Sequence, residues 1–462
     1  MANPAKQLVG MLAELGRVTD EPGRLTRTFL SPAMQRANAL VAGWMKDAGL
    51  TVRVDAVGNL IGRLEANCRA GSPDSAFSRN RGGVRRPRPT RTLLLGSHLD
   101  TVCDAGKFDG PLGVLLPIVA LGELRRRGVQ LPFAVEVLGF SEEEGVRFAS
   151  AYLGSKGYCG KLRASDLELC DAAGVSVTET LIQFTRECHC EETRVAGRRS
   201  NPSGSPRPAD SGLAMTNHAG KYALPKPAHK RGELLGYVEV HIEQGPVLEQ
   251  KRLAVGVVSA IAGQSRFKLT WTGKAGHAGT TPMALRRDAL AGAAEFTLGV
   301  EAIARRTPGL VATVGALTVS PGAANVIPGE VVLTLDVRHA RDSVRRAALM
   351  QIGRLATQIA DRRRLVRTWQ RTQENGAVNC SPELSARLAR SVQAVQGKSL
   401  TLVSGAGHDG VVVSTLTPVA MLFVRCRDGL SHHPDEYASP ADLDVALRVM
   451  IDFLARLAAD GR

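Results

Sequence analysis

Apolar residues in the first part of the chain recur with the periods of alternating helices and strands. Ser31 precedes an apolar stretch at helical spacing, where its hydroxyl group can cap the first turn. The short apolar run at 92–96 is typical of a buried strand. The expected elements are a helix at 33–50, a hairpin at 51–64, a strand at 92–96, a helix at 112–127 and a strand at 133–140. This order predicts a layered α/β domain.

The section 253–365 has a different order of elements. Its pattern predicts a strand, a helix, two strands and a helix, at 266–271, 286–304, 310–319, 331–337 and 342–360. Such an order is typical of a small α+β sheet with its helices on one face. The α/β pattern returns after residue 379, with helices at 382–395 and 440–459 and strands at 400–403 and 419–424. We therefore expect a larger domain, 1–252 and 366–462, that is interrupted by a smaller domain, 253–365.

The chain of 462 residues carries a formal net charge of +15, and most of this charge lies in two segments. Seven Arg and one Asp give 67–91 a net charge of +6, and eight Lys or Arg with four acids give 187–232 a net charge of +4. Neither segment has a helical or strand period, so we expect exposed, mobile insertions. Phe77 and Tyr222 are their sole aromatic residues, which argues against a nucleic-acid partner. The role of the insertions stays open.

Composition also bears on location. No apolar run reaches the roughly 18 residues of a membrane-spanning helix, and residues 1–16 lack the basic and apolar regions of a secretory signal. Eight Cys are too few for a disulfide scaffold. Cys188 and Cys190 have no second Cys/His cluster at zinc-site spacing, so free thiols are favoured there, with a metal-binding or redox role left open. We expect a cytoplasmic protein without a membrane span.

Histidines and carboxylates follow several of the predicted strands. His98 and Asp100 come directly after the strand at 92–96, and Asp109 lies a few residues further on. The carboxyl ends of strands are where α/β sheets place their sites. An Asp two residues beyond a His can hold its second ring nitrogen and fix its tautomer. On these residues alone, a loop histidine with capping carboxylates is the alternative.

Three further clusters have the same character. The three Glu at 142–144 follow a strand, and adjacent carboxylates repel one another unless solvent or a cation neutralises them. An acidic helix start is the alternative for this cluster. Period-two spacing in 239–243 places two Glu and one His on one face of a strand. The fourth cluster is SHHPDE at 431–436.

Taken together, the clusters resemble the motifs of the amidase branch of the di-metal aminoacylase and carboxypeptidase superfamily. That branch contains allantoate amidohydrolases, N-carbamoyl-L-amino acid hydrolases and β-ureidopropionases. The matching stretches are GSHLDTVCDAGKFDG (96–110), GFSEEEGVRF (139–148), VEVHIEQGPVLE (238–249), GKAGHAGTTPM (273–283), ANVIPGEV (324–331), LDVRH (335–339), SGAGHDG (404–410) and GLSHHPDEY (429–437). The resemblance implies a phosphorylase/hydrolase-like α/β catalytic domain for two metal ions, with an inserted, smaller α+β domain of ferredoxin-like fold for dimerisation and as a lid.

The resemblance also implies two divalent metal ions per subunit, Zn or Mn, and a set of ligands for them. The ligands would be His98 and His241 for the first ion, Glu144 and His432 for the second, and Asp109 as the bridge between the two. Two cations about 4 Å apart need a bridging carboxylate, and they lower the pKa of a shared water molecule. Neutral imidazoles and carboxylates without thiolates suit Zn or Mn.

Catalytic roles follow from the same resemblance. Asp100 would orient the His98 ring. Glu143 would be the general base, which takes a proton from the water molecule and passes it to the leaving nitrogen. His277 would stabilise the developing oxyanion and would come from the partner subunit of a homodimer.

Substrate contacts are implied in the same way. Arg338 would form a bidentate pair with a substrate carboxylate, which a planar guanidinium group fits well. Gln244 and Asn325 would form hydrogen bonds with the ureido group or the carboxylate. Gly407, in the loop 404–409, would line the carboxylate end through backbone groups.

The implied function is that of a cytoplasmic, homodimeric, metal-dependent amidohydrolase that cleaves the carbamoyl group of a small carboxylate. The stretches FSEEEGVRF, VSAIAG (258–263) and MLFVRCRDGLSHHPDE (421–436) are more similar to bacterial allantoate amidohydrolases. This favours conversion of allantoate to ureidoglycine with release of ammonia and carbon dioxide. N-carbamoyl-L-amino acid hydrolase is the close alternative, and β-ureidopropionase is another. A nonenzymatic basic binding protein is the distant alternative, which the intact ligand set argues against.

Overall fold

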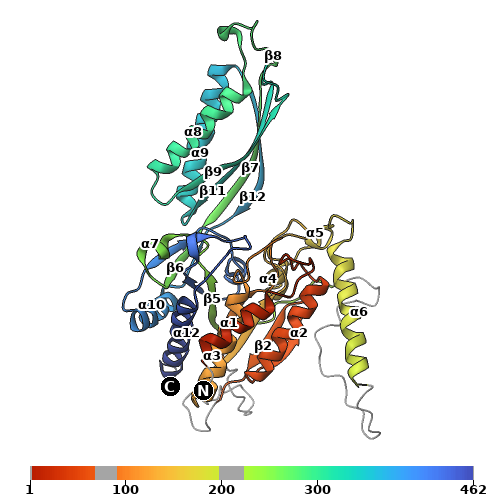
Figure 1. The fold of residues 1–462 in the computed structure, drawn as a ribbon, viewed down its shortest axis with the longest axis vertical. Helices are drawn as coiled ribbons and strands as arrows, with labels where there is room; N and C mark the ends of the chain where they lie inside the picture. The colour runs from red at the N-terminus through yellow and green to blue at the C-terminus, as the bar shows by residue number, and fades with distance from the viewer. Residues whose placement is uncertain (1–2, 68–90, 197–222, 461–462) are drawn as a thin grey trace, which may run out of the picture. The chain divides into compact units, whose positions relative to one another are not determined.

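The computed structural model describes residues 3–67, 91–196 and 223–460, and it describes side chains outside 187–196 (Figure 1). The chain divides into two compact units. The first unit comprises Met1–Ser259, Cys380–Leu402 and His408–Arg462, and the second comprises Ala260–Asn379 and Val403–Gly407.

The first unit is built on a mixed sheet in the order β1-β2-β4-β3-β5-β15-β6. These strands are β1 (Thr51–Val54), β2 (Leu60–Leu64), β3 (Thr92–His98), β4 (Ala134–Phe140), β5 (Leu234–Ile242), β6 (Val255–Ile261) and β15 (Val419–Val424), and the chain adds β14 (Thr401–Ser404). The central strands β4, β3, β5 and β15 run parallel. Every residue of β3 and β4 is buried, as expected for parallel strands covered on both faces.

The first unit has helices that cover this sheet with apolar side chains and helices that pack elsewhere. They are α1 (Pro4–Leu15), α2 (Pro32–Asp47), α3 (Pro111–Arg126), α4 (Leu153–Tyr158), α5 (Ala164–Leu167), α6 (Val177–Ala196), α7 (Val247–Lys251), α10 (Pro382–Gln396), α11 (Gly410–Val413) and α12 (Pro440–Asp460), with the 3₁₀ turn η3 (Arg427–Gly429). Helices α1, α2, α3, α10 and α12 share one hydrophobic core with β3, β5 and β15. In the part of the chain that the structure describes, no helix is long and apolar enough to cross a membrane.

The second unit has the element order β-α-β-β-α-β, which is that of a ferredoxin-like fold. Its elements are β7 (Gly263–Thr272), β8 (Gly276–His277), η2 (Met283–Leu285), α8 (Ala289–Arg306), β9 (Val311–Ser320), β10 (Val326–Ile327), β11 (Glu330–His339), α9 (Asp342–Arg363), β12 (Val366–Asn375) and β13 (Val378–Asn379). The antiparallel sheet has the order β12-β7-β11-β9. Helices α8 and α9 lie together on one face of it (Figure 1), where Trp271 and Phe296 are fully buried in the core.

The second unit begins and ends later than the expected range 253–365. Strand β12 pairs along its length with β7, so residues after 365 belong to the smaller sheet. The sequence of β12, VRTWQRTQEN, is mostly polar, and no residue in it is fully buried. The hydrophobic pattern therefore does not predict this strand. At the other end, β6 pairs with β15 of the first unit's sheet.

The two basic segments are only partly described. Residues 68–90 and 197–222 lie outside the described residues. Their expected exposed, mobile character therefore stays a prediction. Helix α6 continues to Ala196, so the expectation that the segment 187–232 is wholly without helix is wrong for its first ten residues. The end of that segment is anchored, because His229 Nε2 lies 3.0 Å from Glu136 Oε2, which belongs to the buried strand β4.

Helix α3 packs closely on the sheet at Gly113, which yields a prediction about stability. A Cβ atom at Gly113 would lie 2.3 Å from the Val240 carbonyl oxygen, so the helix would have to move away from β5. At Gly122, on the same helix, a Cβ atom would meet nothing closer than the Ala48 Cβ at 3.8 Å. We expect Gly113→Ala to lower the free energy of unfolding by about 1–3 kcal/mol and Gly122→Ala to raise it by up to about 1 kcal/mol.

Chemical denaturation of the two variants beside the wild type measures both changes. The two substitutions are identical and lie in one helix, so helix propensity cancels from the comparison. Equal stability of the two variants would contradict the close approach of α3 to β5.

Candidate metal centre

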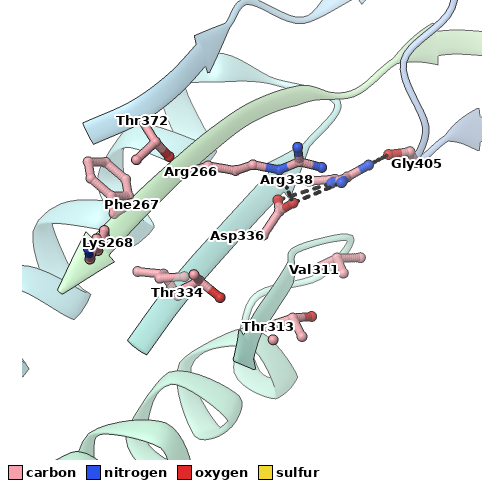
Figure 2. A pocket seen from close by; sticks show the side chains of 12 residues that line it. Arg266, Phe267, Lys268, Val311, Thr313, Thr334, Asp336, Arg338, Thr372 and Gly405 are labelled. Carbon is pink, nitrogen blue, oxygen red and sulfur yellow. Dashed lines mark hydrogen bonds and ion pairs between the residues drawn. The ribbon is translucent and has the colours of Figure 1, made fainter. Parts of the chain in front are cut away.

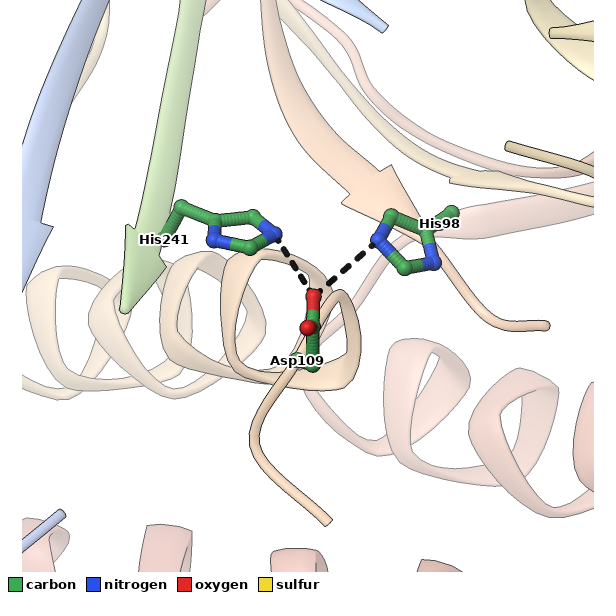
Figure 3. Close-up of side chains that lie close together, drawn as sticks. All are labelled: His98, Asp109 and His241. Atoms are coloured by element: carbon green, nitrogen blue, oxygen red, sulfur yellow. Dashed lines mark ion pairs between the residues drawn. The ribbon is translucent and has the colours of Figure 1, made fainter. Parts of the chain in front are cut away.

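Three of the predicted ligands meet at the carboxyl ends of neighbouring parallel strands (Figure 3). His98 is the last residue of β3, His241 lies near the end of β5, and Asp109 stands just before α3. Asp109 Oδ1 lies 3.1 Å from His241 Nε2 and 3.6 Å from His98 Nε2. All three side chains are buried.

The second oxygen of Asp109 faces another pair of predicted ligands. His432 Nε2 lies 3.4 Å from Asp109 Oδ2 and 3.6 Å from Glu144 Oε1. In each group, one with His98 and His241 and one with Glu144 and His432, the possible ligand atoms lie within 4.8 Å of one another. Asp109 therefore belongs to two potential cation sites at once.

The two buried imidazoles are oriented by backbone carbonyl groups. His98 Nδ1 lies 3.0 Å from the Asp100 carbonyl oxygen, and His241 Nδ1 lies 3.0 Å from that of Ile242. A carbonyl oxygen only accepts, so each Nδ1 donates, and the neutral ring keeps its lone pair on Nε2, which faces Asp109. His241 Nε2 is buried and makes no hydrogen bond. This arrangement fits a metal ion at the Nε2 atoms.

Asp100 connects the His98 loop to the turn that follows β4. Its carboxylate accepts the backbone N–H of Glu143 at 3.0 and 3.1 Å and that of Glu144 at 3.1 Å. Asp100 Oδ1 lies 3.4 Å from His98 Nδ1, which is farther than the Asp100 carbonyl oxygen. The Asp100 side chain thus mainly holds the 143–144 turn, and its backbone carbonyl is the closer partner of the ring.

The electrostatics of the site favour added positive charge. Burial, together with repulsion from Asp109, raises the pKa of Glu144 to about 8. Burial and then repulsion from Glu144 raise the pKa of Glu143 well above its usual value. Burial alone would lower the pKa of His98, but the nearby carboxylates of Asp100 and Asp109 raise it well above its usual value. Crowded carboxylates in a buried site are what a divalent cation neutralises.

Asp109 has further hydrogen-bond partners that the sequence pattern did not reveal. Gln244, which was expected to contact substrate, donates its amide N–H to Asp109 Oδ2 at 2.9 Å. Ser431 Oγ lies 2.6 Å from the same oxygen. Glu436 Oε1 accepts the backbone N–H groups of Phe108 at 2.9 Å and Asp109 at 3.1 Å. Ser431 and Glu436 stand in the motif that contains His432, but spacing alone does not reveal their contacts.

A second buried layer lies behind His241. The ring centroid of His408 is 4.5 Å from that of His241. Glu239 accepts a hydrogen bond from Ser97 Oγ at 2.8 Å and from the Gly410 N–H at 3.2 Å. Period-two spacing in β5 predicts that Glu239 lies on the same face as His241. His408 stands in the quoted stretch 404–410, but no spacing predicts its contact with His241.

The second unit holds the residues predicted to contact the oxyanion and the substrate, and they lie in two groups. His277 and Asn325 form one group, and Arg338 with the 403–407 segment forms the other. His277 lies in β8 and pairs with β10, and the Asn325 carbonyl oxygen accepts the Ala278 N–H at 2.9 Å. His277 is exposed, and its Nδ1 accepts the N–H groups of Gly279 at 3.0 Å and Thr280 at 3.2 Å. The neutral ring therefore carries its proton on Nε2, where it can be donated to an anion.

Arg338 lies near the end of β11, on a face that it shares with Asp336 (Figure 2). Its guanidinium donates to the Asp336 carboxylate and, through Nη1, to the Gly405 carbonyl oxygen at 2.7 Å. Gly407 belongs to the same short segment, 403–407, of the second unit.

Comparison with known proteins gives a consistent result. The family model described as "Peptidase family M20/M25/M40" matches residues 94–456 of this chain. The allantoate deiminase of Arabidopsis thaliana is 38% identical over 97% of this chain and 81% of its own length. The N-carbamoyl-L-amino acid amidohydrolase of Geobacillus stearothermophilus is also 38% identical, over 97% of both chains.

A solved structure gives the same family resemblance. The hydantoinase/carbamoylase family amidase from Burkholderia multivorans superposes with a TM-score of 0.81 at 28% identity, over 98% of both chains. With the histidine and carboxylate groups around Asp109, these matches identify the chain as a metal-dependent amidohydrolase that belongs to peptidase family M20/M25/M40.

Proposed function

We propose that this amidohydrolase cleaves the ureido group of a small carboxylate. The observation that carries the proposal is the position of Asp109, whose two oxygens face two separate groups of potential metal ligands. Allantoate is the first proposed substrate, with ureidoglycine, ammonia and carbon dioxide as products. N-carbamoyl-L-amino acids are the second, because the G. stearothermophilus amidohydrolase is as similar to this chain as the A. thaliana deiminase is.

The proposed cofactor is a pair of Zn or Mn ions. When bound, such ions activate a water molecule and the carbonyl group as Lewis acids. The ions would be held by His98 and His241, by Glu144 and His432, and by Asp109 in both groups. The Nε2 lone pairs and the crowded carboxylates of this site support the assignment.

The protein's own groups supply the proton transfer and the substrate contacts in this proposal. Glu143, buried beside Glu144 and His98, would move the proton from water to the leaving nitrogen. His277 Nε2–H would donate to the developing oxyanion. Arg338 and the Gly407 backbone would bind the substrate carboxylate. The ureido group or the carboxylate would form hydrogen bonds with Asn325 and Gln244.

The proposed function is tested by ammonia release from allantoate and from a panel of N-carbamoyl-L-amino acids. We expect turnover of allantoate that a chelator abolishes and that Mn or Zn restores, because the ligand groups would lose their ions. Activity on N-carbamoyl amino acids alone would reverse the order of the two substrates. Failure to turn over any ureido carboxylate with either metal would overturn the proposal.

The general base is tested by Glu143→Gln, with the adjacent Glu142→Gln as a matched control. Glutamine keeps the size of the side chain but cannot take up the proton, so kcat should fall about 10²- to 10⁴-fold in the first variant. Glu142 accepts the Gly145 N–H, which a glutamine oxygen also does, so the second variant should lose far less activity. Metal content is measured in both, and near-wild-type kcat in Glu143→Gln would remove this residue from its proposed role.

We further propose a homodimer that pairs through the second unit. β9 is an edge strand that pairs only with β11 in the described sheet, and an exposed sheet edge can pair with another chain. Leu317 on β9 is 42% exposed, and Leu298 on the neighbouring α8 is 67% exposed. A second copy that covers this edge would also bury these apolar side chains.

Donation of His277 by the partner subunit gives a test by complementation. His277→Ala and Glu143→Gln are each expected to be nearly inactive as homodimers. A heterodimer of the two has one site with both an intact base and an intact donated histidine. Random subunit exchange should therefore restore about a quarter of wild-type activity, measured as ammonia release. Full inactivity of exchanged dimers, verified by light scattering and mass spectrometry, would place His277 in its own subunit's site.

We also propose a cytoplasmic location. Cys103, Cys159, Cys170, Cys380 and Cys426 are free thiols in the described chain, which agrees with a reducing compartment. Cys188 and Cys190 lie within helix α6, and their side chains are outside the described residues.

A further inference from the structure

A cavity of about 660 Å³ opens on one face of the second unit's sheet (Figure 2). Its lining comes from β7, β9, β11, β12 and Gly405. Asp336 and Arg338 alternate along β11 with Leu335 and Val337, which are buried in the core with α8 and α9. The charged pair therefore lies on the sheet face opposite these helices.

The charge of this cavity is unbalanced. Among the described residues that line it, Arg266, Lys268 and Arg338 are cations and Asp336 is the one acid. The cavity therefore carries a net positive charge and suits an anionic group.

Asp336 is the centre of the polar contacts in the cavity. Its Oδ1 accepts from Arg338 Nε at 3.0 Å, and its Oδ2 accepts from Arg338 Nη2 at 2.8 Å. Oδ2 also accepts from Arg266 Nε and Gln264 Nε2, both at 2.8 Å. Burial raises the pKa of Asp336, but the hydrogen bonds from the two arginines outweigh burial and lower this pKa below its usual value. The carboxylate is therefore ionised at neutral pH.

These contacts determine which donors of Arg338 remain for a ligand. A guanidinium group has five N–H donors. Asp336 takes one on Nε and one on Nη2, and the Gly405 carbonyl oxygen takes one on Nη1. One N–H group remains on each terminal nitrogen, which matches the two oxygens of a carboxylate.

We propose that Asp336 is the positioning residue of the substrate's carboxylate subsite. It holds the Arg338 guanidinium by its Nε–Nη2 edge, so that the two remaining N–H groups receive a small molecule with a free carboxylate beside its ureido group. The inference rests on the proposed function, in which Arg338 binds this carboxylate. Holding the long side chain in advance reduces the conformational entropy lost on binding.

Charge and positioning predict opposite effects of removing the acid. Asp336→Asn takes a negative charge away from an anion site, so electrostatics alone would tighten carboxylate binding and lower KM. Loss of positioning frees the guanidinium and raises KM. The sign of the change in KM therefore separates the two explanations.

The experiment measures kcat and KM of Asp336→Asn with the ureido carboxylate that the wild type hydrolyses best. We expect KM to rise about 10- to 100-fold with little change in kcat, because the lost interaction is with a part of the substrate that does not react. Asp361→Asn, an exposed carboxylate on α9, is the matched control and should leave both constants unchanged. An unchanged or lower KM in Asp336→Asn would overturn the inference.

Two further variants show whether Asp336 acts through Arg338. In an Arg338→Ala background, adding Asp336→Asn should raise KM no further, and a second rise of equal size would overturn the inference. Asp336→Glu keeps the charge but is longer, so it should displace the guanidinium and raise KM too. This variant decides the question if the Asn variant fails to fold.

Calorimetry with N-carbamoylglycine and chelator-treated protein separates this inference from the proposed function. If the wild type binds the compound but, with metal added, hydrolyses no ureido carboxylate, the proposed function is overturned. The inference about Asp336 is then decided by comparing the Kd of the wild type with that of Asp336→Asn. A higher Kd in the variant supports positioning. Absence of binding to the wild type overturns the inference.

Discussion

The need for positive charge at the carboxyl edge of the first sheet governs the candidate metal centre. Asp109, Glu143 and Glu144 lie close together in buried surroundings, where like charges repel strongly. The chain places imidazole Nε2 atoms beside them, and the backbone packs closely against the His98 ring. Gly110 shows this constraint, because it has a φ of +79° and a Cβ atom there would lie 2.4 Å from the His98 ring. Helix α3 can begin directly after Asp109 only with glycine at this position.

Part of this candidate centre could be predicted from the sequence because several of its histidines and carboxylates lie at or just after the ends of buried strands, whereas the assignment of ligands to two ions came only from the resemblance to the amidase branch. The apolar runs that become β3 and β4 locate the carboxyl edge of the sheet, where His98 ends β3 and Glu144 follows β4. His241 has a different signal, which is its period-two spacing with Glu239 in β5. The larger and smaller sheets could be predicted for the same reason, since most of their strands and helices bury one face or both.

Contacts made through the backbone or by polar strands were not predictable in this way. Glu436 holds Asp109 through backbone N–H groups, which every residue type except proline has, so no spacing reveals the contact. Asp336 stands in the quoted motif, but the hydrogen bond that it accepts from Arg266 depends on the register of β11 with β7. Strand β12 gives no hydrophobic pattern because most of its side chains are polar and none is fully buried.

The two carbonyl groups that orient His98 and His241 have one more consequence. Each lies within two residues of the ring it holds, at Asp100 and at Ile242, and each belongs to the main chain. A carbonyl oxygen is the same whatever side chain its residue bears. Substitutions at these two positions can therefore change the surroundings of the site during evolution. The direction of both imidazole lone pairs stays the same as long as the backbone keeps its path.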